Sequence, residues 1–176
     1  MRRFEILALC GSLRAQSKNR RALLTAREAA PPGCVVTLWE GLSQLPAFSP
    51  DLDRAGQDLP APVKELEAAI GRADALLIAC PEYAHGIPGA FKNALDWMVG
   101  SVIFPGKAVA LLNVAPHAHR AQAQLREVLQ TMSAELIDAA CRTIAFPQSD
   151  SFAAEDAFRT ELRLMLDNFQ AAACRR

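Results

Sequence analysis

Five short apolar runs alternate with amphipathic helical stretches along this chain, and the alternation restricts the folds it can adopt. The runs cover residues 4–10, 35–39, 75–80, 108–114 and, more weakly, 143–146. Uninterrupted apolar runs of this length are typical of parallel strands that helices cover on both faces. Between and after the runs, apolar residues recur at helical spacing, as at Phe91, Ala94, Leu95 and Met98. The pattern predicts an α/β fold, a three-layer, doubly wound, five-stranded parallel sheet.

The winding of such a sheet indicates where a ligand would bind. We expect residues 1–176 to form one domain with strand order 2-1-3-4-5. Ligands of such sheets bind beyond the carboxyl ends of the strands, where the winding reverses, here between the first and third strands. The loops that start at residues 11, 81 and 115 would open into that crevice. The Pro- and Asp-rich segment 41–62 is long for a connection, and we expect it to help bury a ligand or a neighbouring subunit.

The first of these loops has the composition of a phosphate site. Residues 11–19 read GSLRAQSKN, and no Asp or Glu occurs between Ile6 and Arg27. A strand that turns through small residues into a helix directs backbone N–H groups and a positive helix end at one spot. The side chains that can join them are Ser12, Arg14, Ser17 and Asn19. Neither GxxxxGK[ST] nor GxGxxG is present, which favours one terminal monophosphate. The alternative is a polar turn with a solvated basic helix start.

The second loop has features of a surface against which a flat ligand lies. Residues 81–97 read PEYAHGIPGAFKNALDW, with Pro81 ending a strand and Pro88 starting a helix. Tyr83 is the one tyrosine of the chain, so it can stack on a ring or donate a hydrogen bond, and Gly86 permits close approach. The alternative is a strand-to-helix connection without a ligand.

Composition excludes several other classes of protein. Lys plus Arg and Asp plus Glu number 19 each, which argues against general binding to nucleic acid or an anionic membrane surface. The basic, apolar start resembles a signal peptide, but Glu5 interrupts it, so we interpret it as a strand and expect a cytoplasmic protein. Five cysteines without a CxxC pair predict neither a disulfide framework nor a zinc site, and we interpret Cys10 and Cys80 as small buried apolar residues.

Taken together, GSLRAQSKN and PEYAHGIPGAFKNALDW resemble the two signature loops of the NADPH-dependent FMN reductase family, a flavodoxin-like group. The resemblance implies FMN as cofactor and NADPH, or NADH, as a transient hydride donor. It implies a ping-pong oxidoreductase in which the flavin carries the chemistry, with no catalytic residue and no metal from the protein. The implied acceptors are quinones, azo compounds, metal oxyanions or free flavin, and the implied assembly is a homodimer or homotetramer.

The resemblance assigns roles residue by residue. The family's phosphate positions match Ser12, Arg14, Ser17 and Asn19, and its isoalloxazine-contacting loop matches Pro81, Glu82, Tyr83, Ala84, His85 and Gly86. Two positions differ from the usual PEYN pattern, with Ala84 in place of the asparagine and Gly86 in place of a serine. The third loop, at 115–119, lacks the family's glycines and carries His117 and His119.

Two alternative functions stay open for the sequence. One is a flavodoxin-like electron carrier, which the neutral charge and Arg14 disfavour, because flavodoxins tend to be strongly acidic. The other is a flavin-free interaction protein with a degenerate site, which the altered second and third loops favour. The helix predicted at 89–100 carries Phe91, Trp97 and Met98. These side chains can form a contact patch for a second subunit or cover the sheet, and both can hold for different faces of the helix.

Overall fold

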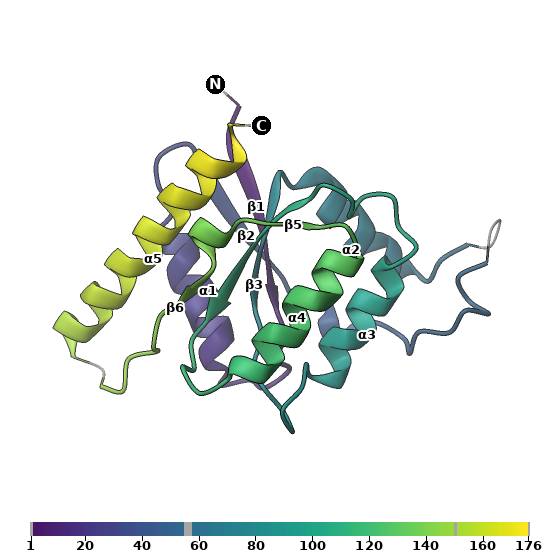
Figure 1. Cartoon of the computed structure of the whole chain (residues 1–176), viewed down its shortest axis with the longest axis horizontal. Coiled ribbons are helices and arrows are strands. Elements are labelled where there is room, and N and C mark those ends of the chain that lie inside the picture. The colour runs from purple at the N-terminus through teal and green to yellow at the C-terminus, as the bar shows by residue number, and fades with distance from the viewer. Residues whose placement is uncertain (1, 55–57, 150, 176) are drawn as a thin grey trace.

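A parallel sheet between two layers of helices organises the chain, as the alternation of apolar runs and helical stretches predicts (Figure 1). The computed structural model describes residues 2–54, 58–149 and 151–175. Its long strands are β1 (Phe4–Cys10), β2 (Cys34–Trp39), β3 (Ala75–Ala79) and β4 (Ala108–Asn113). The order along the sheet is β2-β1-β3-β4-β5, and every pairing is parallel. The predicted fold class and strand order are therefore confirmed.

Helices cover both faces of the sheet. They are α1 (Lys18–Glu28), α2 (Ala61–Arg72), α3 (Gly89–Met98), α4 (His119–Thr131) and α5 (Phe152–Ala173). Helices α1 and α5 pack on one face, where Leu23 and Phe169 are fully buried. Helices α2, α3 and α4 pack on the other face through residues such as Ile70, Phe91 and Leu129. No helix among the described residues is long and apolar enough to cross a membrane.

The sequence predicts one strand at 143–146 for the fifth position of the sheet, and the structure has two short strands there. Two short pieces, β5 (Glu135–Leu136) and β6 (Arg142–Thr143), both pair with β4. A 3-10 turn, Asp138–Ala140, separates them. Ile137 and Ala140, which lie at this turn, are both buried in the core. Beyond β6 the chain still follows β4, since the Ile144 N–H donates to the Asn113 carbonyl at 2.9 Å.

The strand register brings three loops together at the carboxyl edge of the sheet. Cys10 is opposite Ala79, and Ala79 is opposite Leu112, so β1, β3 and β4 end almost level. The Gly11 N–H extends the β1–β3 ladder by donating to the Ala79 carbonyl at 2.9 Å. The chain therefore leaves β1, β3 and β4 at neighbouring points, which is the arrangement predicted for the crevice.

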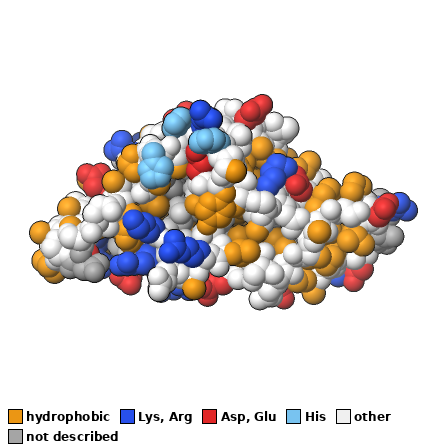
Figure 2. Space-filling model, turned by 90° about the horizontal axis from the view of Figure 1, so that it is seen from below, with side chains coloured by type: hydrophobic (Ala, Val, Ile, Leu, Met, Phe, Trp, Pro, Cys, Tyr) orange, Lys and Arg blue, Asp and Glu red, His pale blue; other side chains and the backbone are white. Residues whose placement is uncertain are grey.

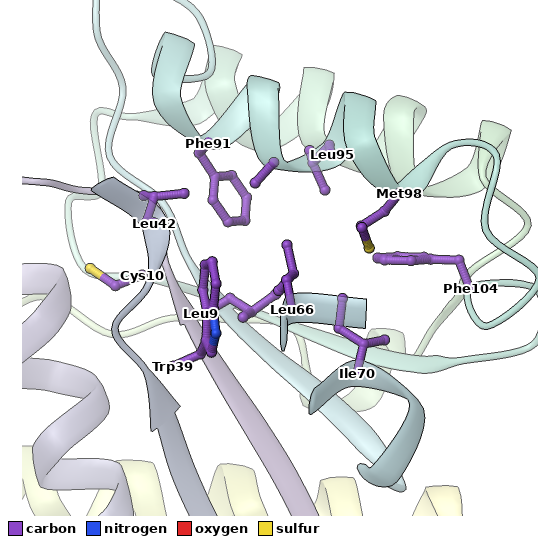
Figure 3. Close-up of a pocket in the computed structure, with 11 residues that line it drawn as sticks. Leu9, Cys10, Trp39, Leu42, Leu66, Ile70, Phe91, Leu95, Met98 and Phe104 are labelled. Carbon is purple, nitrogen blue, oxygen red and sulfur yellow. The ribbon is translucent and has the colours of Figure 1, made fainter. Parts of the chain in front are cut away.

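The apolar layer between the sheet and α2 and α3 is closed. In Figure 3, Phe91, Leu95 and Met98 of α3 point toward Leu66 and Ile70 of α2. The cavity that remains among these side chains has a volume of about 10 Å³, close to the smallest space that holds one water molecule. A ligand of this fold must therefore lie outside the core, along the edge where the loops emerge.

The first part of the long segment 41–60, around Pro46 and Phe48, is bonded to helix α3. The Pro46 carbonyl accepts hydrogen bonds from Asn93 Nδ2 and Trp97 Nε1, each at 2.9 Å. The Phe48 ring packs edge-on against Trp97, with ring centroids 5.2 Å apart. Figure 1 shows the described residues that follow, 49–54, extending away from the helices. Phe91, Trp97 and Met98 are all buried, so these three cover the sheet and do not form a surface patch.

Candidate functional site

The first turn of α1 has backbone amides that no acceptor within the helix uses. Ser17 is the N-cap, and its hydroxyl accepts a hydrogen bond from the Arg20 N–H at 3.2 Å. The amides of Lys18 and Asn19 have no acceptor within the helix, as in any first turn. No acidic residue occupies that turn, so the positive end of the helix is not neutralised from within the helix.

Two side chains of the first loop are also available to a ligand. Arg14 is exposed, and no carboxylate among the described residues lies within ion-pairing distance of it, whereas Arg20 is paired with Glu40. Asn19 is only 7 % exposed, and its Oδ1 is buried without a hydrogen-bond partner. A buried amide without a partner is uncommon, because it loses its hydrogen bonds to water without replacement. A half-turn of the Asn19 side-chain amide exchanges Oδ1 and Nδ2, so that an N–H donor lies where Oδ1 lies now.

Gly11 joins the first and second loops in tight contact. A Cβ atom at residue 11 would lie 2.7 Å from Cys80 Sγ and 3.1 Å from Cys80 Cα. Burial raises the pKa of Cys80 to about 12 and also raises the pKa of Cys10 above its ordinary value. Both thiols therefore stay protonated at neutral pH, which agrees with their interpretation as small apolar residues and excludes a thiolate nucleophile at either position.

The second loop is a tight hairpin. Tyr83 and Gly86 exchange two backbone hydrogen bonds, at 3.1 and 2.9 Å. Between them, Ala84 and His85 have φ values of 49° and 63°. Positive φ at both central residues defines a type I′ turn, which favours Asn, Asp and Gly. Alanine in this conformation is strained by contact between its Cβ and the following carbonyl oxygen. The turn holds the backbone of residues 83–86 at the carboxyl edge.

Replacing Ala84 by asparagine is expected to stabilise the protein. Asparagine tolerates the left-handed conformation, so Ala84→Asn should raise the free energy of unfolding by about 1 kcal/mol. The measurement is urea denaturation followed by circular dichroism. Ala84→Val should move the midpoint in the opposite direction, because a β-branched side chain fits positive φ poorly. Equal midpoints for the three proteins would contradict the turn geometry.

Glu82 connects the second loop to α4. Its side chain is only 12 % exposed. Oε2 accepts hydrogen bonds from the Arg120 and Ala121 amides, at 2.9 and 3.0 Å, and Oε1 lies 3.1 Å from Nδ1 of His85. The helix's own N-cap residue, Ala118, has no side chain that can cap it. Glu82 therefore caps α4 from another loop, an interaction between residues nearly 40 positions apart that the sequence reasoning missed.

The charge of Glu82 is expected to stabilise the fold at neutral pH. The Ala121 amide, followed by His85 and the Arg120 amide, lowers the pKa of Glu82 below its ordinary value of 4.5. A lowered pKa means that the ionised carboxylate stabilises the folded state, fully above pH 4.5 and less as the pH falls through the lowered value. Glu82→Gln should unfold at lower urea concentration than the wild type at neutral pH, and this gap should close in acid. A gap of constant size across this range would contradict the assignment.

The third loop completes the edge. Asn113 is buried at the end of β4, and its Oδ1 accepts a hydrogen bond from the Ala115 amide at 3.1 Å. His119 begins α4, with Nδ1 3.0 Å from the His117 carbonyl oxygen. Figure 2 views the carboxyl edge and shows the histidines gathered on it, near a group of Lys and Arg side chains. Although the net charge of the chain is zero, this edge carries a local basic patch.

The structure thus brings the predicted residues to one edge. Ser12, Arg14, Ser17 and Asn19 lie on the first loop and the start of α1. Pro81, Glu82, Tyr83, Ala84, His85 and Gly86 form the adjacent hairpin and the residues that lead into it. The carboxylate of Glu82 is turned toward α4, and the Gly86 backbone lies against the Gln124 side chain, since a Cβ there would be 3.3 Å from Gln124 Oε1.

Known proteins share both this sequence pattern and this fold. Residues 4–147 match the family model for NADPH-dependent FMN reductase. The chain is 32 % identical over 168 residues to an NAD(P)H-dependent FMN reductase of Pseudomonas aeruginosa, across 93 % of this chain and 85 % of that one. It is also 32 % identical over 96 residues to a quinone reductase of Escherichia coli K12, across 54 % of this chain and 50 % of that one.

Solved structures agree on the fold. A flavoenzyme NAD(P)H:(acceptor) oxidoreductase of Paracoccus denitrificans superposes with a TM-score of 0.75 at 24 % identity, covering 95 % of this chain and 97 % of that one. The apo form of an NADH:FMN oxidoreductase superposes with a TM-score of 0.67 at 23 % identity, covering 96 % and 89 %. The chain therefore belongs to the NADPH-dependent FMN reductase family and is an oxidoreductase that uses FMN and NAD(P)H.

Proposed function

We propose that the first loop binds the FMN phosphate, that the second loop lies along the isoalloxazine ring, and that reduced flavin passes electrons to a small molecule in a ping-pong reaction. The observation that carries this proposal is that two loops leave neighbouring strands at the same edge of the sheet. The first loop follows β1 and leads to exposed Arg14 and to Asn19, whose Oδ1 has no partner, and the Tyr83–Gly86 hairpin follows β3. The expected acceptors are quinones, azo compounds, metal oxyanions or free flavin.

The residues present fit a phosphate ester. Helix amides, the Ser12 and Ser17 hydroxyls, the Arg14 guanidinium and the Asn19 amide together supply many donors. No carboxylate lies among them, since residues 7–26 contain neither Asp nor Glu. The buried Oδ1 of Asn19 without a partner indicates that this amide is arranged for a group outside the protein.

The second loop fits a flat ring through its backbone. The Glu82 carboxylate is already bonded to α4, so contacts to a ring come from the main chain of Pro81, Glu82, Ala84, His85 and Gly86. Strained, hydrogen-bonded backbone of this kind is typical of ligand sites. Tyr83 is 51 % exposed and has room to stack on a ligand.

When bound, FMN supplies the hydride chemistry, and the chain supplies position. Because the core beneath the edge has no space for a ring, FMN would lie on the surface with one face covered by the loops. NAD(P)H and the acceptor would then use the open face in turn, which favours a ping-pong reaction over simultaneous binding.

We also propose a homodimer or homotetramer built from a single domain per chain. Residues 49–54 extend away from the helices (Figure 1), and among them Leu52 is 44 % exposed. After α3, Val99 and Val102 are 60 % and 89 % exposed. Apolar side chains in such positions are typical of interfaces. Light scattering coupled to gel filtration measures the mass in solution, and a monomer at all concentrations would contradict this part of the proposal.

An anaerobic spectroscopic experiment tests the enzymatic proposal. Purified protein is mixed with FMN, and NADPH or NADH is added, followed by a quinone. We expect the yellow flavin absorbance to bleach with NAD(P)H and to return with the quinone. An electron carrier would not bleach without a second reductase, and a flavin-free protein would not bind FMN. Either result would overturn the proposed function.

A further inference from the structure

The hydrogen bonds around the second loop form a chain that ends on an exposed imidazole. The Arg120 and Ala121 amides donate to Oε2 of Glu82, and Oε1 lies 3.1 Å from His85 Nδ1. The carboxylate is mostly buried at 12 % exposure, whereas the His85 side chain is 70 % exposed. One ring nitrogen is therefore held by an oriented carboxylate. The other has no hydrogen bond to any of the described residues, so it can meet a ligand at the carboxyl edge.

This arrangement has the parts of a proton-transfer group. An ionised carboxylate is an acceptor only, so Nδ1 of His85 must carry a proton in order to bond to it. A carboxylate on Nδ1 fixes the orientation of the ring, so that Nε2 is the nitrogen that exchanges a proton with a ligand. The backbone carbonyl of His85 accepts a hydrogen bond from the neutral amide of Gln124, at 3.5 Å from Nε2.

Resting on the proposed function, we propose that His85 is a catalytic residue, the acid that protonates the acceptor, and that Glu82 is its positioning residue. Reduction of a quinone to a hydroquinone consumes two electrons and two protons. One proton travels with the two electrons as hydride that originates in NAD(P)H. The second proton moves from Nε2 of His85 to the remaining quinone oxygen, the hydroquinone leaves, and His85 regains its proton from water.

The test compares two acceptors that differ in their need for a proton. Protein loaded with FMN and reduced by NADPH is mixed without oxygen with para-benzoquinone or with ferricyanide, which accepts one electron and no proton. The variant His85→Gln keeps an N–H donor for Glu82 but has no proton to transfer. We expect the ratio of its quinone rate to its ferricyanide rate to fall about 10²-fold relative to the wild type, the lower end of the usual range for acid catalysis.

Chemical rescue separates proton transfer from a structural role. In His85→Ala, free imidazole should restore quinone reduction by occupying the vacated space, while His85→Gln should show no rescue. Equal slowing with both acceptors would mean that His85 only shapes the site, and would overturn the assignment. An unchanged quinone rate in His85→Gln would overturn it as well.

A spectroscopic measurement without turnover checks the Glu82–His85 contact. Nitrogen NMR of the ring distinguishes which nitrogen of neutral histidine carries the proton, and His85→Gln identifies the signal among the three histidines of the chain. We expect the proton on Nδ1, and a proton on Nε2 alone would overturn the proposal.

If NADPH does not reduce the wild-type protein, the proposed function fails and this role with it. If the wild type reduces both acceptors and the variant matches it, only the role of His85 fails.

Discussion

Replacing Arg14 by alanine is expected to raise the dissociation constant for FMN by about 10- to 150-fold. The guanidinium is exposed and free of ion pairs with the described carboxylates, so a phosphate would receive its full charge-assisted hydrogen bonding. Such a contact contributes about 1.5–3 kcal/mol, and each 1.4 kcal/mol is about a tenfold change in affinity. Quenching of flavin fluorescence during titration measures the constant.

Two controls show whether the loss comes from the phosphate. Arg27→Ala removes an arginine from the last turn of the same helix, so it should leave FMN affinity unchanged. Riboflavin lacks the phosphate, so Arg14→Ala should hardly alter its weaker binding. Equal affinity for FMN in Arg14→Ala and wild-type protein would contradict the assignment of the first loop.

Replacing Gly11 by alanine is expected to destabilise the protein by about 1–3 kcal/mol, as overpacking of a close-packed contact does. The new methyl group would meet Cys80 Sγ at 2.7 Å and the Cys80 backbone at 3.1 Å. Relief requires β1 and β3 to separate at their carboxyl ends, which moves the first loop away from the second. FMN affinity should therefore fall together with the unfolding midpoint in urea.

A second glycine and a second substitution provide matched controls. Gly89 begins α3 and has no atom within 4 Å of a built Cβ, so Gly89→Ala should not lower stability. Adding Cys80→Ala to Gly11→Ala removes the 2.7 Å contact but leaves those to the Cys80 backbone, so rescue should be partial. Full stability of Gly11→Ala alone would contradict the tight junction.

The layered fold was predictable because the signals that specify it are local. Buried parallel strands produce apolar runs, and the covering helices produce stripes, so the four long strands lie within one residue of their predicted ends. The fifth position was harder to predict, because its pairing to β4 depends on that neighbour and not on its own sequence. Polar Glu135 and Arg142 occupy the two short strands, and only the edge of β4 places them there.

In the candidate site, too, features that depend on local sequence were predicted, and features that depend on distant residues were not. The composition of residues 11–19 and the resemblance of the second loop predicted which loops meet, and the structure brings them together. The Glu82 cap on α4 joins residues 82 and 120–121, and no spacing rule connects such distant positions. The type I′ turn was also missed, since alanine at a left-handed position contradicts the residue preference from which such turns are predicted.

The most direct test of the central claim, that the first loop holds the FMN phosphate, is a crystal structure of the protein with FMN. We predict that the phosphate lies at the N-terminus of α1, within hydrogen-bonding distance of Arg14 and Asn19, with the ring along the Tyr83–Gly86 hairpin. A phosphate bound elsewhere, or a first loop whose own side chains fill that position, would contradict the account.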